Sequence, residues 1–214
     1  RTRQWEKLEA ALSHPAWLMQ HWARQWTPER AVRIALANNT VPQSCFWLNP
    51  LRGNPAELRL ELEAQGVQVR EVPGFTGTLE WVEGDFSLLW SLVEAGSAYV
   101  QDVASRQVAH WVGVEPGMDV LDMCAAPGGK TACLAVIMNN QGTISALEIH
   151  AQRVAELKAN VARLGATIIT AYLADSTDES LFPGLAQRHS QFSILNSQFD
   201  AVLVDAPCSG TGTL

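Results

Sequence analysis

The second half of the chain alternates short apolar runs with stretches in which apolar residues recur every three or four positions. The apolar runs are expected strands, at residues 119–124, 143–148, 167–173 and 199–205. The periodic stretches are expected helices, at residues 101–111, 130–138 and 151–164. Strands that alternate with helices at this spacing form right-handed β-α-β units with a parallel sheet. The pattern therefore predicts an α/β fold.

The first 38 residues have a helical pattern from residue 4 onward. Ser13-His-Pro15 and Thr27-Pro28 each place a proline in the first turn of a helix, where its missing N–H costs nothing. Trp17, Trp22 and Trp26 follow at helical spacing. We expect them to form a small helical core; the alternative is a set of exposed aromatic rings that stack on nucleic-acid bases.

Residues 43–96 have a different pattern, with a strand at 45–48, a helix from Asn54-Pro55 to Gly66, an alternating strand at 67–72 and a short helix at 85–96. This is a small α+β module. The expected division is a helical segment at 1–38, the module at 39–97 and a ligand-binding domain at 98–214. A doubly wound sheet normally continues beyond four strands, so we expect the sequence to be a fragment, cut off after the fourth strand.

Composition narrows the class of protein. Hydrophobic residues make up 47% of the chain, yet no apolar run is long enough for a transmembrane helix. The net charge of −7 argues mildly against a large nucleic-acid surface, although residues 1–33 hold 6 Lys or Arg against 3 Asp or Glu. The 4 cysteines are dispersed, without a C-x-x-C pair. We therefore expect a cytoplasmic, monomeric protein with reduced thiols, no membrane segment and no metal site.

A small-residue turn follows the first expected strand of the second half. A phosphate-binding P-loop would need glycine where Cys124 stands, and no G-x-G-x-x-G dinucleotide motif is present. A glycine pair at the start of a helix still allows backbone N–H groups to approach a ligand. The expected cofactor-binding residues are Cys124, Ala125, Ala126, Pro127, Gly128, Gly129 and Lys130. The alternative is a tight turn with a purely structural role.

Carboxylates follow the next three strands. Glu148 comes 20 residues after Gly128, where a carboxylate reaches the hydroxyls of an adenosine ribose bound at the first turn. Asp175 and Asp205 end the following two strands. We expect these carboxylates to converge on one crevice. An acidic crevice repels phosphates and favours a ligand with a positive centre, so S-adenosylmethionine fits better than ATP or NAD.

The segment Asp205-Ala-Pro-Cys208 combines an acid with a thiol. Carbon 5 of a pyrimidine becomes nucleophilic only after a thiolate has added at carbon 6, so C5 methylation needs a cysteine. It also needs an acid near N3 and the exocyclic amine, a role that suits Asp205. The alternative is that Cys208 is a small buried residue.

Two long motifs carry a family resemblance: Cys124-Ala-Ala-Pro-Gly-Gly-Lys-Thr131 and Asp205-Ala-Pro-Cys-Ser-Gly-Thr-Gly212. Together they resemble the Fmu/Sun (Nop/Sun) family of RNA cytosine-C5 methyltransferases. Shorter segments are similar to the family or its bacterial ribosomal-RNA members: Tyr99–Ser105, Asn38-Asn39, Leu48-Asn-Pro-Leu-Arg52 and Ser13-His-Pro-Ala-Trp-Leu18.

The resemblance implies a Rossmann-like methyltransferase fold preceded by an RNA-recognition-like module, with ribosomal RNA as the partner. It also implies that residues 124–130, Glu148, Asp175 and Asp205 bind S-adenosylmethionine, and that Lys130 orients Asp205. In this family the attacking cysteine belongs to a later Thr-Cys-Ser motif, so Cys208 is expected to release the product. DNA methyltransferases use their Pro-Cys cysteine as the nucleophile, which leaves that role open for Cys208. The alternative from another class is a non-catalytic RNA-binding or ribosome-assembly protein.

Overall fold

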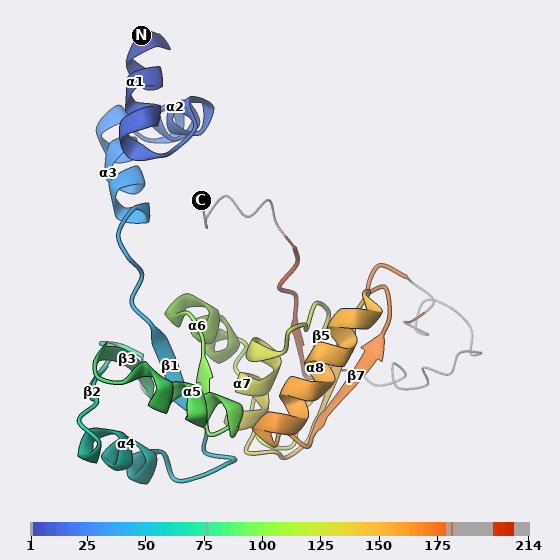
Figure 1. Cartoon of the computed structure of the whole chain (residues 1–214). Helices are drawn as coiled ribbons and strands as arrows, with labels where there is room; N and C mark the ends of the chain where they lie inside the picture. The colour runs from blue at the N-terminus through green and yellow to red at the C-terminus, as the bar shows by residue number, and fades with distance from the viewer. Residues whose placement is uncertain (1, 76, 179–180, 182–198, 208–214) are drawn as a thin grey trace. The chain divides into compact units, whose positions relative to one another are not determined.

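A computed structural model describes residues 2–75, 77–178, 181 and 199–207 (Figure 1). The described residues fall into two units, one that ends at Pro42 and one that spans Gln43–Ala206. No helix in these ranges is long and apolar enough to cross a membrane.

The first unit consists of three helices, α1 (Thr2–Leu12), α2 (Ala16–Gln25) and α3 (Pro28–Asn38). Leu12, Met19 and Ala35 form its core, with Trp5 and Trp22 packed against them. The expected tryptophan core is therefore only partly correct, because Trp17 and Trp26 are exposed.

A buried histidine joins the ends of these helices. His14 Nδ1 lies 2.5 Å from the Leu12 carbonyl, and Asn38 donates to its Nε2 at 3.2 Å. Asn39 donates to the same Leu12 carbonyl at 2.8 Å. The His14 ring and the Asn38-Asn39 pair thus satisfy carbonyl and ring acceptors that burial removes from water.

The second unit begins with a four-stranded antiparallel sheet and two helices. Its elements are β1 (Cys45–Leu48), α4 (Pro55–Ala64), β2 (Gln68–Glu71), β3 (Thr78–Glu83), α5 (Phe86–Glu94) and β4 (Ala98–Val100). The strand order is β2-β3-β1-β4, the β-α-β-β-α-β arrangement of ferredoxin-like and RNA-recognition modules. The sequence pattern predicted β1, α4, β2 and α5 but not β3 or β4.

The remaining elements build a parallel sheet: α6 (Val103–Trp111), β5 (Asp119–Asp122), α7 (Gly129–Ile137), β6 (Thr143–Glu148), α8 (Ala151–Leu164), β7 (Ile169–Leu173) and β8 (Ala201–Leu203). The strand order is β7-β6-β5-β8 and every pair is parallel. This confirms the predicted Rossmann-like α/β fold. The order reverses between β5 and β8, and ligands bind at such a switch point, beyond the carboxyl ends of the strands.

Both faces of this sheet are covered at its central strand β5. Val120 packs in the core with Leu134 of α7 and Ile144 of β6. Its neighbour Leu121 points to the opposite face, against Leu147. Both residues are at most 2% exposed, so β5 is buried on both faces, as expected for a central strand of a parallel sheet.

Candidate active site

A pocket of about 190 Å³ lies where β4 and the start of α6 meet the carboxyl ends of β5 and β8. It is lined by Tyr99, Val100, Gln101, Ser105, Asp122, Cys124, Ala125, Ala126, Pro127, Gly129, Lys130 and Asp205. An engineered cavity of about 150 Å³ holds one benzene ring, and sites for larger ligands span about 300–1,000 Å³. The pocket is therefore large enough for a single six-membered ring.

Both glycines of the turn after β5 are required by close packing. Gly128 has a left-handed φ of 103°, and a Cβ there would lie 2.7 Å from Leu157 Cδ1. A Cβ on Gly129 would lie 2.9 Å from the ring of Tyr99. The glycine pair thus lets α8 and β4 approach the start of α7 from two sides.

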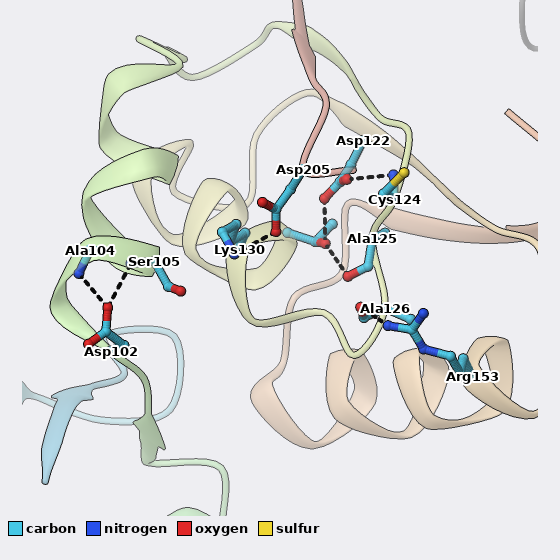
Figure 2. A network of polar contacts seen from close by, with 11 residues as sticks. Asp102, Ala104, Ser105, Asp122, Cys124, Ala125, Ala126, Lys130, Arg153 and Asp205 are labelled. Carbon is cyan, nitrogen blue, oxygen red and sulfur yellow. Dashed lines mark hydrogen bonds and ion pairs between the residues drawn. The ribbon is translucent and has the colours of Figure 1, made fainter. Parts of the chain in front are cut away.

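Side chains of α8 fix the turn from outside the pocket. Arg153 donates to the Ala126 carbonyl at 2.7 Å, and Asn160 donates to the Pro127 carbonyl at 2.9 Å. Figure 2 shows Arg153 reaching from α8 to Ala126. The backbone of the turn is therefore held rigidly beside the pocket.

A buried carboxylate that the sequence analysis did not select holds the turn from inside. Asp122, at the end of β5, accepts a hydrogen bond of 2.7 Å from the Thr131 hydroxyl. It also accepts one of 3.3 Å from the Cys124 N–H (Figure 2). Burial raises the pKa of Asp122 to about 6, with the Asp205 carboxylate contributing to the rise, while its hydrogen bonds and Lys130 oppose it. Its position at the carboxyl end of a buried strand was the available sequence signal.

Lys130 and Asp205 form an ion pair at the switch point. Lys130 Nζ lies 2.6 Å from Asp205 Oδ2, and Figure 2 shows the two side chains pointing toward each other. Lys130 lies in the first turn of α7, the helix that follows β5, and Asp205 follows β8. Because β5 and β8 are neighbours in the sheet, the ion pair connects the segments that follow these two strands. The Lys130 side chain is 20% exposed and that of Asp205 is 48% exposed, so Asp205 remains accessible to a ligand in the pocket.

Cys124 lies in a negative electrostatic environment. Burial raises the pKa of its thiol, and the carboxylates of Asp122, Glu148 and Asp205 raise it further against a hydrogen bond with Ser176. The thiol therefore stays protonated near neutral pH. Three carboxylates thus act on one thiol, in agreement with a concentration of negative charge at this edge of the sheet.

The other two predicted carboxylates have partners of their own. Glu148 is 5% exposed, accepts from the His150 N–H at 2.9 Å and lies 3.2 Å from Arg153 Nη1. Asp175 is exposed, and hydrogen bonds from the hydroxyl and N–H of Thr177 lower its pKa.

The pocket thus brings together most of the predicted site residues but not all of them. Gly128, Glu148 and Asp175 are not among its lining residues. Cys208 lies outside the described residues. Tyr99, Gln101, Ser105 and Asp122 line the pocket without having been selected individually, although the segment Tyr99–Ser105 was part of the family resemblance.

Two family models match the chain. One, described as 16S rRNA methyltransferase RsmB/F, matches residues 109–214. The other, described as a Methyltr_RsmF/B-like ferredoxin-like domain, matches residues 14–79. The second match agrees with the strand order of the module.

Individual relatives point to the same family. The chain is 32% identical over 208 residues to the probable ribosomal RNA small subunit methyltransferase B of Bacillus subtilis, covering 97% of this chain and 44% of that protein. It is 40% identical over 140 residues to the ribosomal RNA small subunit methyltransferase F of Vibrio cholerae, covering 63% of this chain and 27% of that protein. The chain therefore spans less than half the length of these curated relatives.

A solved structure extends the agreement to the fold. A methyltransferase homologue from Pyrococcus horikoshii superposes with a TM-score of 0.80 at 32% identity, covering 96% of this chain and 63% of that one. The matched models, the relatives and the fold confirm the resemblance carried by the two motifs. The chain belongs to the RsmB/F family of 16S rRNA methyltransferases.

Proposed function

We propose that the chain forms the cofactor-binding and base-binding part of an S-adenosylmethionine-dependent RNA cytosine-C5 methyltransferase that acts on ribosomal RNA. The observation that carries this proposal is the Lys130–Asp205 ion pair of 2.6 Å in a pocket the size of one ring. Relatives named as small-subunit rRNA methyltransferases support ribosomal RNA as the substrate class.

The charge and shape of the crevice fit S-adenosylmethionine. Carboxylates at the ends of the strands favour its sulfonium and ammonium groups, and the turn held by Gly128 brings backbone close to a ligand. Residues 124–130, Asp175 and Asp205 would hold the cofactor together with Glu148. Each carboxylate oxygen can accept two hydrogen bonds, so Glu148 can still accept from ribose hydroxyls beside its contacts with His150 and Arg153. When bound, S-adenosylmethionine supplies an electrophilic methyl group.

Asp205 and Lys130 act on the base. Asp205 accepts a hydrogen bond from the exocyclic amine of cytosine. When a thiolate adds at carbon 6, the displaced electron pair moves to N3, which takes up a proton delivered through the Asp205 carboxyl. The same proton returns when carbon 5 loses its proton and the thiolate is eliminated. Lys130 fixes the orientation of Asp205 through the ion pair. The target base must leave its stack or be unpaired in order to enter the pocket.

Cys208 is assigned the release of the methylated product, as in the family that the motifs resemble. The Thr-Cys-Ser motif that carries the attacking cysteine in that family does not occur in residues 1–214. Cys208→Ser in the enzyme expressed from its own gene should accumulate a covalent protein–RNA adduct, because addition proceeds while elimination stalls. Loss of every adduct would instead make Cys208 the nucleophile, since a serine hydroxyl is too weakly acidic to attack. A denaturing gel after incubation with RNA and S-adenosylmethionine distinguishes the two roles.

The same proposal assigns a separate role to each of three segments of the chain. Residues 1–38 form a helical segment, residues 39–97 an RNA-recognition-like module and residues 98–214 the cofactor domain. The ferredoxin-like strand order of the module supports a contact with RNA, because RNA-recognition modules use this sheet.

Bisulfite sequencing of ribosomal RNA from cells with and without the gene tests the activity. One cytosine should become sensitive to bisulfite conversion when the gene is deleted and should be protected from it again when the gene is restored. Asp205→Asn and Lys130→Met should fail to restore protection, whereas Lys158→Met, on the exposed face of α8, should restore it. Unchanged protection in the deletion strain would reject the activity and favour a non-catalytic role in RNA binding or assembly.

A further inference from the structure

The side-chain amide of Gln101 is held in one orientation. The indole Nε1–H of Trp47 donates a hydrogen bond of 2.9 Å to Gln101 Oε1, and both residues are buried. An indole nitrogen can only donate, so the atom that faces Trp47 must be the amide oxygen and not the nitrogen. The amide nitrogen of Gln101 therefore points away from Trp47, with two N–H donors.

These donors belong to the pocket of Lys130 and Asp205. Gln101 is one of its lining residues, and no described residue accepts a hydrogen bond from its amide nitrogen. This nitrogen is not among the fully buried polar atoms that lack a partner in the described part of the chain, so its N–H groups are open to water in the pocket. A ligand that displaces this water can supply the acceptor instead.

The pocket thus offers donors on Gln101 and an acceptor on Asp205 in a space that fits one ring. The Watson–Crick edge of cytosine presents the matching groups in a row: an exocyclic amine, a ring nitrogen and a carbonyl oxygen. Enzymes that extrude a base read it through hydrogen bonds to this edge.

We propose that Gln101 is a base-binding residue whose amide N–H donates to the carbonyl oxygen O2 of the target cytosine while Asp205 binds the exocyclic amine. This inference rests on the proposed function and deepens it. Trp47 is then a positioning residue, because its indole N–H fixes which end of the Gln101 amide faces the base. β4 and Gln101, which follows it, thereby contribute one wall of the base pocket, and Trp47 of β1 supports that wall.

A second aromatic contact supports this arrangement. The rings of Trp47 and Tyr99 lie with their centroids 5.7 Å apart, and Tyr99 fills the space above Gly129. This packing holds β1, β4 and α7 together around Gln101, so the amide is preorganised before a base arrives.

Nuclear magnetic resonance tests the contact without any turnover. The Gln101 side-chain amide signals are identified in the ¹⁵N-labelled protein by their loss in Gln101→Glu. Millimolar cytidine, added with S-adenosylmethionine present, should shift these signals, and ribose 5-phosphate, which lacks the base, should not. Signals that stay in place with cytidine, or that move equally with ribose 5-phosphate, would overturn the proposal.

Kinetics test the same contact in RNA. Gln101→Glu keeps the oxygen that accepts from Trp47 but replaces the N–H donors with an oxygen, so the KM for unmodified 16S rRNA should rise about tenfold or more. Trp47→Phe should raise it in the same direction. Gln107→Glu on α6 makes the same change of charge away from the pocket and should behave as the parent.

The cofactor is the competing occupant, because its carboxylate could accept from the same donors. Calorimetry with S-adenosylmethionine alone separates the two cases. Equal affinity for the parent and Gln101→Glu supports the base, whereas a tenfold loss assigns the donors to the cofactor and overturns the proposal. The two proposals can also fail separately. If cytidine shifts the Gln101 amide signals but the protein transfers no methyl group to RNA, the activity is rejected while the base contact is retained.

Discussion

The amide of Asn49 donates a hydrogen bond of 2.8 Å to the carbonyl of Leu164, 115 residues further along the chain. Asn49 follows β1 in the module and Leu164 ends α8, the helix between β6 and β7 of the parallel sheet. The same amide donates to the Gly96 carbonyl, also at 2.8 Å, and its oxygen accepts from the Leu51 N–H. One buried side chain thus joins the module to the parallel sheet.

Asn49→Ala should lower the free energy of unfolding by about 2–4 kcal/mol, because it leaves two buried carbonyls without donors. Urea unfolding followed by circular dichroism measures the change. Gln152→Ala, on the exposed surface of α8, serves as the control and should stay within about 0.5 kcal/mol of the parent. An Asn49→Ala protein as stable as the parent would show that the two parts do not depend on this contact.

Gly128→Ala should destabilise the protein and weaken the binding of S-adenosylmethionine. The left-handed φ of 103° costs about 1–2 kcal/mol for a residue with a Cβ, and the contact with Leu157 adds about 1–3 kcal/mol. Urea unfolding and calorimetry measure the two effects.

Gly113→Ala is the matched control, because Gly113 has a φ of 71° and no atom within 4 Å of an added Cβ. Gly113→Ala should lower the free energy of unfolding only by the amount that the left-handed backbone conformation costs, and it should bind S-adenosylmethionine with the affinity of the parent. If both variants lose the same stability, the close approach of Leu157 to the turn is not a constraint.

Long periodic segments made the parallel sheet predictable from the sequence. The strand at 143–148 and the helix at 151–164 have the predicted bounds, because their apolar positions repeat regularly and Gly165 ends the helix in a left-handed conformation. The predicted strands at 119–124 and 199–205 are shorter in the structure, since each gives way to the loop that carries the site.

The module strands were harder to predict, for physical reasons. β3 buries its first four residues in succession, and Glu80 is among them because it pairs with Arg70 of β2, so a charged residue stands where a sequence pattern expects an exposed one. β4 has only three residues and is held by pairing with β1, about fifty positions earlier in the chain. A local pattern contains no information about such a partner.

The motif at the first turn contains six of the twelve residues that line the pocket, whereas the wall formed by Tyr99 and Gln101 depends on tertiary contacts. Asp205 and Lys130 lie together because β8 pairs with β5, which the β-α-β rhythm predicts. Gln101 reaches the pocket only because β4 pairs with β1 and its amide binds Trp47.

Glu148→Ala should weaken S-adenosylmethionine binding by about 1.5–3 kcal/mol, the range for a hydrogen bond to a charged group. Glu148 also pairs with Arg153, so Arg153→Met is needed to separate loss of the ribose contact from disturbance of the turn. Calorimetry should show a larger loss for Glu148→Ala than for Arg153→Met. The reverse order would mean that Glu148 acts by holding Arg153 rather than by binding the cofactor.

Asp122 should make the stability of the protein depend on pH in the mildly acidic range. Burial raises its pKa from 3.8 to about 6, so the folded state binds this proton more tightly than the unfolded state does. The stabilisation from the protonated carboxyl is fully present below about pH 4 and is lost as the pH rises through about 6. A shift of this size corresponds to about 3 kcal/mol between the two protonation states.

Asp122→Asn should flatten this dependence, because the amide oxygen can still accept from Thr131 while no charge forms in the buried site. Urea unfolding at about pH 4 and at about pH 7 measures the change. Asp85→Asn is the control, because Asp85 caps α5 and its backbone hydrogen bond with Ser87 lowers its pKa. Removing the Asp85 carboxylate should leave the loss of stability that Asp122 causes between these two pH values unchanged. If the parent and Asp122→Asn lose the same stability between these pH values, the Asp122 carboxyl is already ionised at the lower one, and the charge at the end of β5 is permanent.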